Sequence, residues 1–185
     1  IIPNDTSVGE WRRGTNDKIV AMGRFRAVTR KDILVRSPWG IGILGTSDLK
    51  KLISLGVHKY DTMLGDWRLG SNDKFEGLGD FDGDGKDEII VRSNWGIGIL
   101  KKDSSITPLK SIAMHQKNTR IGDWVYNNDD KVEGVDDFNG DGRDDILLSS
   151  NWGLGIVTLG PDKKLTTIGL IAYNTKITNR GGTSS

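Results

Sequence analysis

The sequence contains no cysteine. This absence excludes disulfide bonds, zinc–thiolate sites and thiol nucleophiles, so any staple in the protein must use other groups. The sequence also lacks a run approaching the ~20 apolar residues of a membrane span, and we expect no membrane insertion. An excess of one charge is missing as well, because 26 Lys and Arg residues are interleaved with 25 Asp and Glu residues. Without a basic face, nucleic acid is not an expected partner.

Glycine, in contrast, is abundant, with 25 residues, and many of them recur in a sequence that is repeated three times. Residues 9–44, 65–100 and 122–157 align without a gap, at spacings of 56 (9 to 65) and 57 (65 to 122) residues. A fixed period of this size indicates a repeat architecture, in which each unit buries its apolar face only by stacking on its neighbours.

Each copy is interpreted as four short strands. In the middle copy, β-branched and alternating runs predict strands at about 74–79, 88–93, 96–102 and 109–117. Four strands in a unit of this length are typical of a propeller blade. We therefore predict an all-β fold of three tandem four-stranded repeats with pseudo-threefold organisation, forming a single repeat domain over residues 1–185. The repeats are expected at about 4–60, 61–117 and 118–180.

Three blades are fewer than the roughly four to eight of a closed propeller ring. This number leaves three alternatives: the chain is half of a six-bladed ring, it is part of a longer chain, or its three sheets close as a β-prism. A set of three repeats favours self-association into a homo-oligomer or threefold closure.

The second and third copies each contain an oxygen-rich loop of the kind that wraps calcium. Calcium binds roughly six to eight hard oxygens, and alternate residues of a tightly curled loop direct their side chains inward. Gly83 and Gly85 permit the backbone angles of that curl. The predicted ligands of the second copy are Asp80, Asp82, Asp84, the backbone carbonyl of Lys86, and Glu88.

The third copy repeats the loop with one carboxylate fewer. Its predicted ligands are Asp137, Asn139, Asp141, the carbonyl of Arg143, and Asp145. The first copy lacks the ligands, because Arg24 and Arg26 stand in place of the first two acids. We therefore predict two Ca²⁺ sites, in repeats 2 and 3, and none in repeat 1. The remaining Asp32 is expected to pair with Arg24 or Arg26.

All six tryptophans fall inside the repeats, one in each half-unit. One interpretation is that each indole fills the space between stacked sheets. The other is that the second tryptophan of each copy is a platform for sugar, because the glycines of the motif W-G-[IL]-G leave its face open. The candidate ligand-binding residues are then Trp39, Trp95 and Trp152, with Asn94 and Asn151 as hydrogen-bonding partners.

The runs DFDGDGKDEIIV (80–91) and DFNGDGRDDILL (137–148) resemble the calcium-loop core of FG-GAP (VCBS-type) repeats, the blades of integrin α-subunit propellers and of several secreted lectins. The resemblance covers all three copies, of which two have intact loops. It implies a four-stranded blade with calcium in the loop between its first two strands, on a secreted, extracellular protein. It also implies glycan recognition, because lectins similar to this family bind sugars at or between blades.

The leading functional hypothesis is a calcium-stabilised, carbohydrate-binding, lectin-like protein without catalytic activity, with glycans as partners. The alternative is a structural or adhesive module of a larger secreted protein that binds a protein partner. An enzyme is not expected, because His58 and His115 stand at matching repeat positions, with Ala172 in the third copy, and indicate duplicated strand residues. The metal loop accounts for the neighbouring acids Asp87 and Glu88 without a glycosidase pair.

Overall fold

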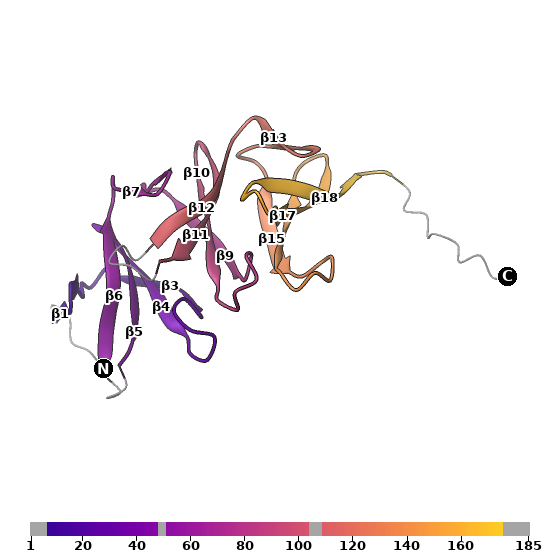
Figure 1. Ribbon diagram of the computed structural model, residues 1–185. Helices are drawn as coiled ribbons and strands as arrows, with labels where there is room; N and C mark the ends of the chain where they lie inside the picture. The colour runs from indigo at the N-terminus through magenta and orange to yellow at the C-terminus, as the bar shows by residue number, and fades with distance from the viewer. Residues whose placement is uncertain (1–6, 48–50, 104–108, 176–185) are drawn as a thin grey trace.

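The computed structural model describes residues 7–47, 51–103 and 109–175, and it is all-β (Figure 1). Three four-stranded antiparallel sheets follow one another along the chain, each with its strands in sequence order, and we call them blades 1, 2 and 3. The predicted fold class is confirmed. The four strands predicted in the middle copy are present, with a difference of one residue at the end of the last strand.

The blades have matching strands. Blade 1 contains β3 (Lys18–Gly23), β4 (Asp32–Ser37), β5 (Gly40–Thr46) and β6 (Leu52–Lys59). Blade 2 contains β9 (Lys74–Gly79), β10 (Glu88–Ser93), β11 (Gly96–Lys102) and β12 (Leu109–Gln116). Blade 3 contains β15 (Lys131–Asp136), β16 (Asp145–Ser149), β17 (Gly153–Leu159) and β18 (Leu165–Ala172). In Figure 1 the blades lie in a row, with blade 2 between the other two.

A short two-stranded hairpin precedes each blade, and the sequence did not predict it. The hairpins are β1 (Ser7–Val8) with β2 (Trp11–Arg12), β7 (Met63–Leu64) with β8 (Trp67–Arg68), and β13 (Thr119–Ile121) with β14 (Trp124–Tyr126). Each hairpin contacts the last strand of the blade that follows it. The tryptophan in the first half of each repeat lies in this hairpin.

That tryptophan fastens the hairpin to its blade. In blade 2, Trp67 is fully buried, and its indole N–H donates a hydrogen bond of 2.8 Å to Asp73. The same carboxylate accepts the backbone N–H of Gly70 at 2.9 Å, so one buried aspartate fixes both the indole and the turn before β9. The equivalent pairs are Trp11 with Asp17 and Trp124 with Asp130.

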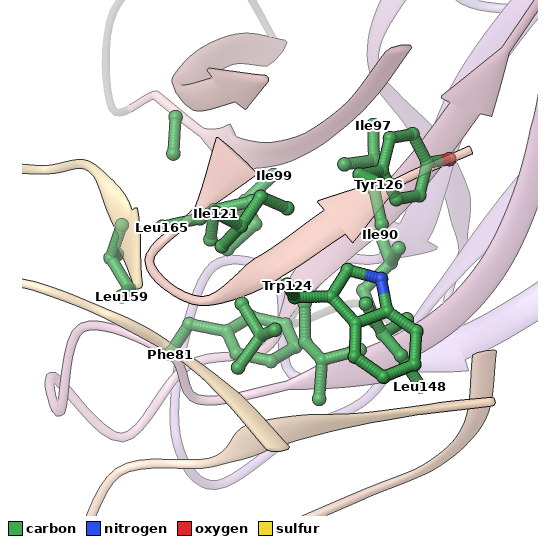
Figure 2. Close-up of a cluster of buried hydrophobic side chains, with 13 residues drawn as sticks. Phe81, Ile90, Ile97, Ile99, Ile121, Trp124, Tyr126, Leu148, Leu159 and Leu165 are labelled. Carbon is green, nitrogen blue, oxygen red and sulfur yellow. The ribbon is translucent and has the colours of Figure 1, made fainter. Parts of the chain in front are cut away.

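Apolar side chains form cores between neighbouring blades. Figure 2 shows the core in which Phe81 and Ile97 of blade 2 pack with Trp124 and Leu148 of blade 3. Corresponding residues of blades 1 and 2 form a second core: Phe25, Ile41, Trp67 and Val91. Each blade therefore presents an outgoing face to the next blade and an incoming face to the blade before it.

Backbone contacts between the β3–β4, β9–β10 and β15–β16 loops also connect the blades. Asp87 of blade 2 accepts the backbone N–H of Arg24 at 2.8 Å and donates its own N–H to the Arg24 carbonyl at 3.1 Å. Asp144 of blade 3 makes the same two contacts with Asp80 of blade 2, at 2.7 and 2.9 Å. Each loop between the first two strands of a blade is thus docked on the equivalent loop of the next blade.

An arginine connects neighbouring blades at the other end of strands β4 and β10, away from the loops that precede these strands. Arg36 on β4 donates to the backbone carbonyl of Asp73, and Arg92 on β10 donates to the carbonyl of Asp130. Blade 3 carries Ser149 at this place.

Within the described residues, no helix has the length and apolar character that a membrane span requires.

Candidate metal centre and ligand-binding hollows

The loop between β9 and β10 brings three carboxylates together. Oxygen atoms of Asp80, Asp82 and Glu88 lie within 4.8 Å of one another, close enough for one cation to contact all three. Gly83 and Gly85 have φ angles of +77° and +81°, the left-handed values that the predicted curl requires. In the described ranges this is the one group of three acidic, histidine or cysteine side chains with such a spacing.

A lysine outside the predicted ligand set lies in this cluster. Lys101, on β11, places its Nζ atom 2.5 Å from Asp82, 2.9 Å from Asp84 and 3.2 Å from Glu88. Burial raises the pKa of Glu88 to about 7, and the nearby Lys101 ammonium opposes that rise. The ammonium is therefore the counter-ion of this loop, and a metal ion that enters must displace it.

Asp84, the fourth predicted carboxylate, lies beside the cluster and is held by two lysines. Lys86 Nζ lies 2.7 Å from it, in addition to Lys101. Burial of Asp84 raises its pKa, but hydrogen bonds from these two lysines outweigh that effect and lower the pKa to about 2. Asp80, in turn, keeps one buried carboxylate oxygen, Oδ1, without a hydrogen-bond partner.

The corresponding loop of blade 3 is organised by its own backbone. The carboxylate of Asp137 accepts the N–H groups of Gly140 at 2.7 Å and Gly142 at 2.8 Å, and hydrogen bonding from the loop backbone, chiefly from Gly142, lowers its pKa. The amide oxygen of Asn139 accepts the N–H of Asp141 at 2.8 Å. The loop is therefore curled as predicted, and Gly140 and Gly142 have the left-handed φ angles of +79° and +82°.

The last predicted ligand of this loop, Asp145, is fully buried at the start of β16. Burial raises its pKa, and it makes no ion pair with a described residue. The hydroxyl of Thr158 lies near enough to lower that pKa, but neither it nor Asp145 Oδ1 completes a hydrogen bond of good geometry. Arg143, whose carbonyl was the other predicted ligand, pairs with Asp141 at 2.7 Å.

In blade 1, arginines replace the metal loop. Asp32 pairs with Arg26 at 2.9 Å, and Arg26 also donates to the carbonyl of Thr46 at 2.7 Å. The prediction that Asp32 pairs with an arginine is thus confirmed, and the partner is Arg26. Arg24 instead reaches across the blade boundary, where its guanidinium lies 2.6 Å from Asp87.

One buried carboxylate therefore begins the second strand of every blade, and its ion pairing differs from blade to blade. Asp32 has the guanidinium of Arg26, and Glu88 has the ammonium of Lys101. Asp145 forms no ion pair with a described residue, and the cation that acts on it is the more distant guanidinium of Arg143, which pairs with Asp141. Because an isolated buried charge is unfavourable, burial favours the neutral form of Asp145 unless a cation lies near it.

The second tryptophan of each copy stacks on the first. The ring centroids of Trp67 and Trp95 lie 4.2 Å apart at an angle of 40°, and Trp95 is only partly buried. Trp39 and Trp152 are partly buried in the same way and stack on Trp11 and Trp124. One part of each indole belongs to the core, and the remainder reaches solvent.

The glycines beside these tryptophans are required for packing. A Cβ atom at Gly98 would lie 2.7 Å from the buried ring of Trp67, and one at Gly96 would lie 2.3 Å from the carbonyl oxygen of His115. The motif therefore alternates because the strand passes close to a tryptophan and to a neighbouring strand.

Polar hollows open at the tryptophan end of the blades. One of about 270 Å³ is lined by Asp61, Arg68, Asn94 and Trp95 among others, which brings two predicted ligand-binding residues together. Two further hollows lie at equivalent blade boundaries. The one between blades 1 and 2, of about 630 Å³, includes Lys18, Arg36, Tyr60 and Ser71; the one between blades 2 and 3, of about 70 Å³, includes Lys74, Arg92, Asn94 and Asn128. Asn151 is exposed next to Trp152.

The two histidines lie on the last strands of their blades. His58 is buried, and its Nε2 accepts the backbone N–H of Leu109 from blade 2 at 2.9 Å. His115 Nε2 lies 2.7 Å from the hydroxyl of Thr119. The strand register places Ile171, one residue before the predicted Ala172, at the matching position of blade 3.

Comparison of the chain with protein-family models and with curated proteins gives no match.

Proposed function

We propose that this chain is a calcium-stabilised, carbohydrate-binding protein of FG-GAP type, secreted and without catalytic activity. The observation that carries the metal part is the buried carboxylate of Asp145, which forms no ion pair with any residue that the structure describes although its equivalents Asp32 and Glu88 both form one. Calcium that draws Asp137 and Asp141 toward this carboxylate would supply the missing charge, although the three do not lie as close together as Asp80, Asp82 and Glu88.

The second calcium site of the proposal is the loop of blade 2. Its support is the set of three converging carboxylates and the unsatisfied Oδ1 atom of Asp80. Because Lys101 already neutralises this loop, calcium has to compete with a tethered ammonium there. We therefore propose unequal affinities, with the tighter site in blade 3.

The test is a calcium titration by calorimetry, together with thermal melts in calcium and in EGTA. Two unequal binding events are expected, and a ligand at ~100 times its Kd stabilises the fold by about 2.7 kcal/mol. Asp141→Asn should remove the tighter event, whereas Asp82→Asn should affect the weaker one. An unchanged melt, with no heat of binding, would rule out both loops as metal sites.

The sugar part of the proposal is supported by the hollow at Trp95. It combines part of an aromatic ring with the polar side chains of Asp61, Arg68 and Asn94, which can hydrogen-bond to a sugar. Carbohydrate sites combine an apolar platform with a few placed polar groups in this way. The two boundary hollows offer further polar surface at the same end of the blades.

A glycan array in calcium tests this part. The wild-type chain should bind a defined set of glycans, and Trp95→Ala should lose that signal while its circular dichroism spectrum stays unchanged. Val125→Ala, at an exposed apolar side chain on β14, serves as the matched control and should bind normally. Absence of every glycan signal in calcium would favour the alternative function, an adhesive module of a larger secreted protein that binds a protein partner.

A further inference from the structure

We infer that two copies of this chain join head to tail into a closed six-bladed ring, using the faces by which its own blades already pack. The chain makes this contact twice internally, and the residues involved correspond from one boundary to the next. Among the described residues, the incoming face of blade 1 and the outgoing face of blade 3 are not covered by another blade.

The outgoing face of blade 3 remains apolar. Phe138 is 44% exposed, whereas its equivalents Phe25 and Phe81 are each 1% exposed because the next blade covers them. Leu154 on β17 and Ile168 on β18 are exposed large apolar residues of the same blade. An exposed set of this kind indicates a surface that another molecule covers.

The incoming face of blade 1 is its counterpart. A hollow of about 220 Å³ is lined mainly by apolar residues of blade 1 and its hairpin, among them Val8, Trp11 and Leu44. In blade 2, the equivalents of these residues receive Phe25 of the preceding blade. Ile19 and Met22, 67% and 61% exposed, lie beside this hollow on β3.

The charged residues at the two free faces are complementary. At the internal boundaries the outgoing loop begins after a glycine, Gly79, and the incoming loop supplies an acid, Asp144. At the free faces the outgoing position is Asp136, whose carboxylate accepts the N–H of Asp137 at 2.9 Å, and the incoming position is Lys31. Docking of the same kind therefore brings an aspartate against a lysine.

The substitution at the outgoing position also fits by size. A Cβ atom at Gly79 would lie 2.6 Å from the branched side chain of Val135, so an internal boundary has no room for aspartate. At the free boundary the counterpart of Val135 is Met22, an unbranched and adaptable side chain.

Two chains give six blades, within the roughly four to eight of closed rings, whereas three chains would give nine.

The test is the mass of the full chain in solution, by native mass spectrometry and analytical ultracentrifugation in calcium. The expected particle has twice the 20.3 kDa mass of the chain. Phe138→Asp should convert it to a monomer with unchanged circular dichroism, whereas Val125→Asp, at an exposed side chain on β14, should leave the dimer intact.

A charge exchange identifies the contact. Lys31→Glu and Asp136→Lys should each weaken the dimer at least tenfold, and the double variant should recover most of the loss. Three results would each overturn the inference. The first is a wild-type monomer at about 50 µM, a concentration in the micromolar range of ordinary affinities. The others are a particle of three or more chains and a double variant that dimerises no better than the single variants.

Discussion

Lys101 and Thr158 occupy the same place in blades 2 and 3, opposite the buried acid that begins the second strand. The two blades therefore provide a natural exchange experiment. Lys101→Thr removes the tethered ammonium from the blade 2 loop and should raise its calcium affinity by about tenfold or more, equivalent to ~1.4 kcal/mol. Titration calorimetry measures the change.

The reverse substitution is the control. Thr158→Lys introduces the ammonium beside Asp145 and should weaken the blade 3 site while leaving the blade 2 site unchanged. In the double variant the tighter site should move from blade 3 to blade 2. Unaltered affinities in Lys101→Thr would show that the ammonium does not compete with the metal.

His58 predicts a distinct pH dependence. Burial lowers its pKa to about 4, with a further contribution from Lys102, and its Nε2 accepts the N–H of Leu109. The unfolded chain binds this proton near the ordinary pKa of about 6.5, so the contribution is complete above that pH. It is lost as the pH falls from about 6.5 to 4, by up to roughly 3 kcal/mol.

Denaturant unfolding of the wild-type chain and of His58→Gln between pH 4 and 7 checks this dependence. The glutamine oxygen can still accept the N–H of Leu109 but does not titrate. Because the glutamine keeps this hydrogen bond, the two proteins should differ least at pH 7, and the wild type should lose stability relative to His58→Gln as the pH falls toward 4. Parallel stability curves would contradict the role of His58.

Among the strands, the alternation of glycine in β5, β11 and β17 follows from the buried tryptophans. Gly98→Ala drives a methyl group into the ring of Trp67 and should destabilise the fold by about 1–3 kcal/mol, as for an overpacked core. Gly134→Ala on β15 is the matched control, because a Cβ atom there meets nothing within 4 Å. Melting curves of both variants test this prediction. Equal stabilities of the two variants would mean that β11 can move away from Trp67 at no cost and would contradict the packing role of Gly98.

The strands and the curl of the metal loops could be predicted from the sequence because both are local. Runs such as EIIVRS carry the β signal themselves, and Gly83 and Gly85 have the positive φ angles that their spacing indicates. The two-residue strands of the hairpins, such as Trp67–Arg68, are too short to show alternation.

The counter-ions could not be predicted in the same way. Lys101 lies on β11 and meets Asp82 only because β11 pairs with β10, which follows the loop, so no local sequence pattern indicates this contact. The sequence alignment predicts Ala172 as the third equivalent of the histidines, one residue too late. The connection from β17 to β18 is one residue shorter than the connection from β11 to β12, and this difference shifts the alignment of the last strand.

For the assembled protein, calcium removal should loosen the boundary between blades 2 and 3 before it melts the sheets. The amides of Asp80 and Asp144 bond across this boundary, and Asp80 is also a candidate ligand. Hydrogen exchange followed in EGTA should show faster exchange at these amides. The strands β4 and β5 of blade 1, which has no metal loop, should keep their rates; a uniform increase would contradict this order.

Asp80 thus has two roles, since its carboxylate belongs to the candidate metal cluster and its peptide group docks the following blade. Thermodynamic linkage makes such sharing symmetrical: whatever affinity the ion gains from a well-seated neighbour, the neighbour gains from the ion. A cation bound at this cluster would consequently also stabilise the contact with the next blade, and its concentration would set how rigidly blades 2 and 3 are held together.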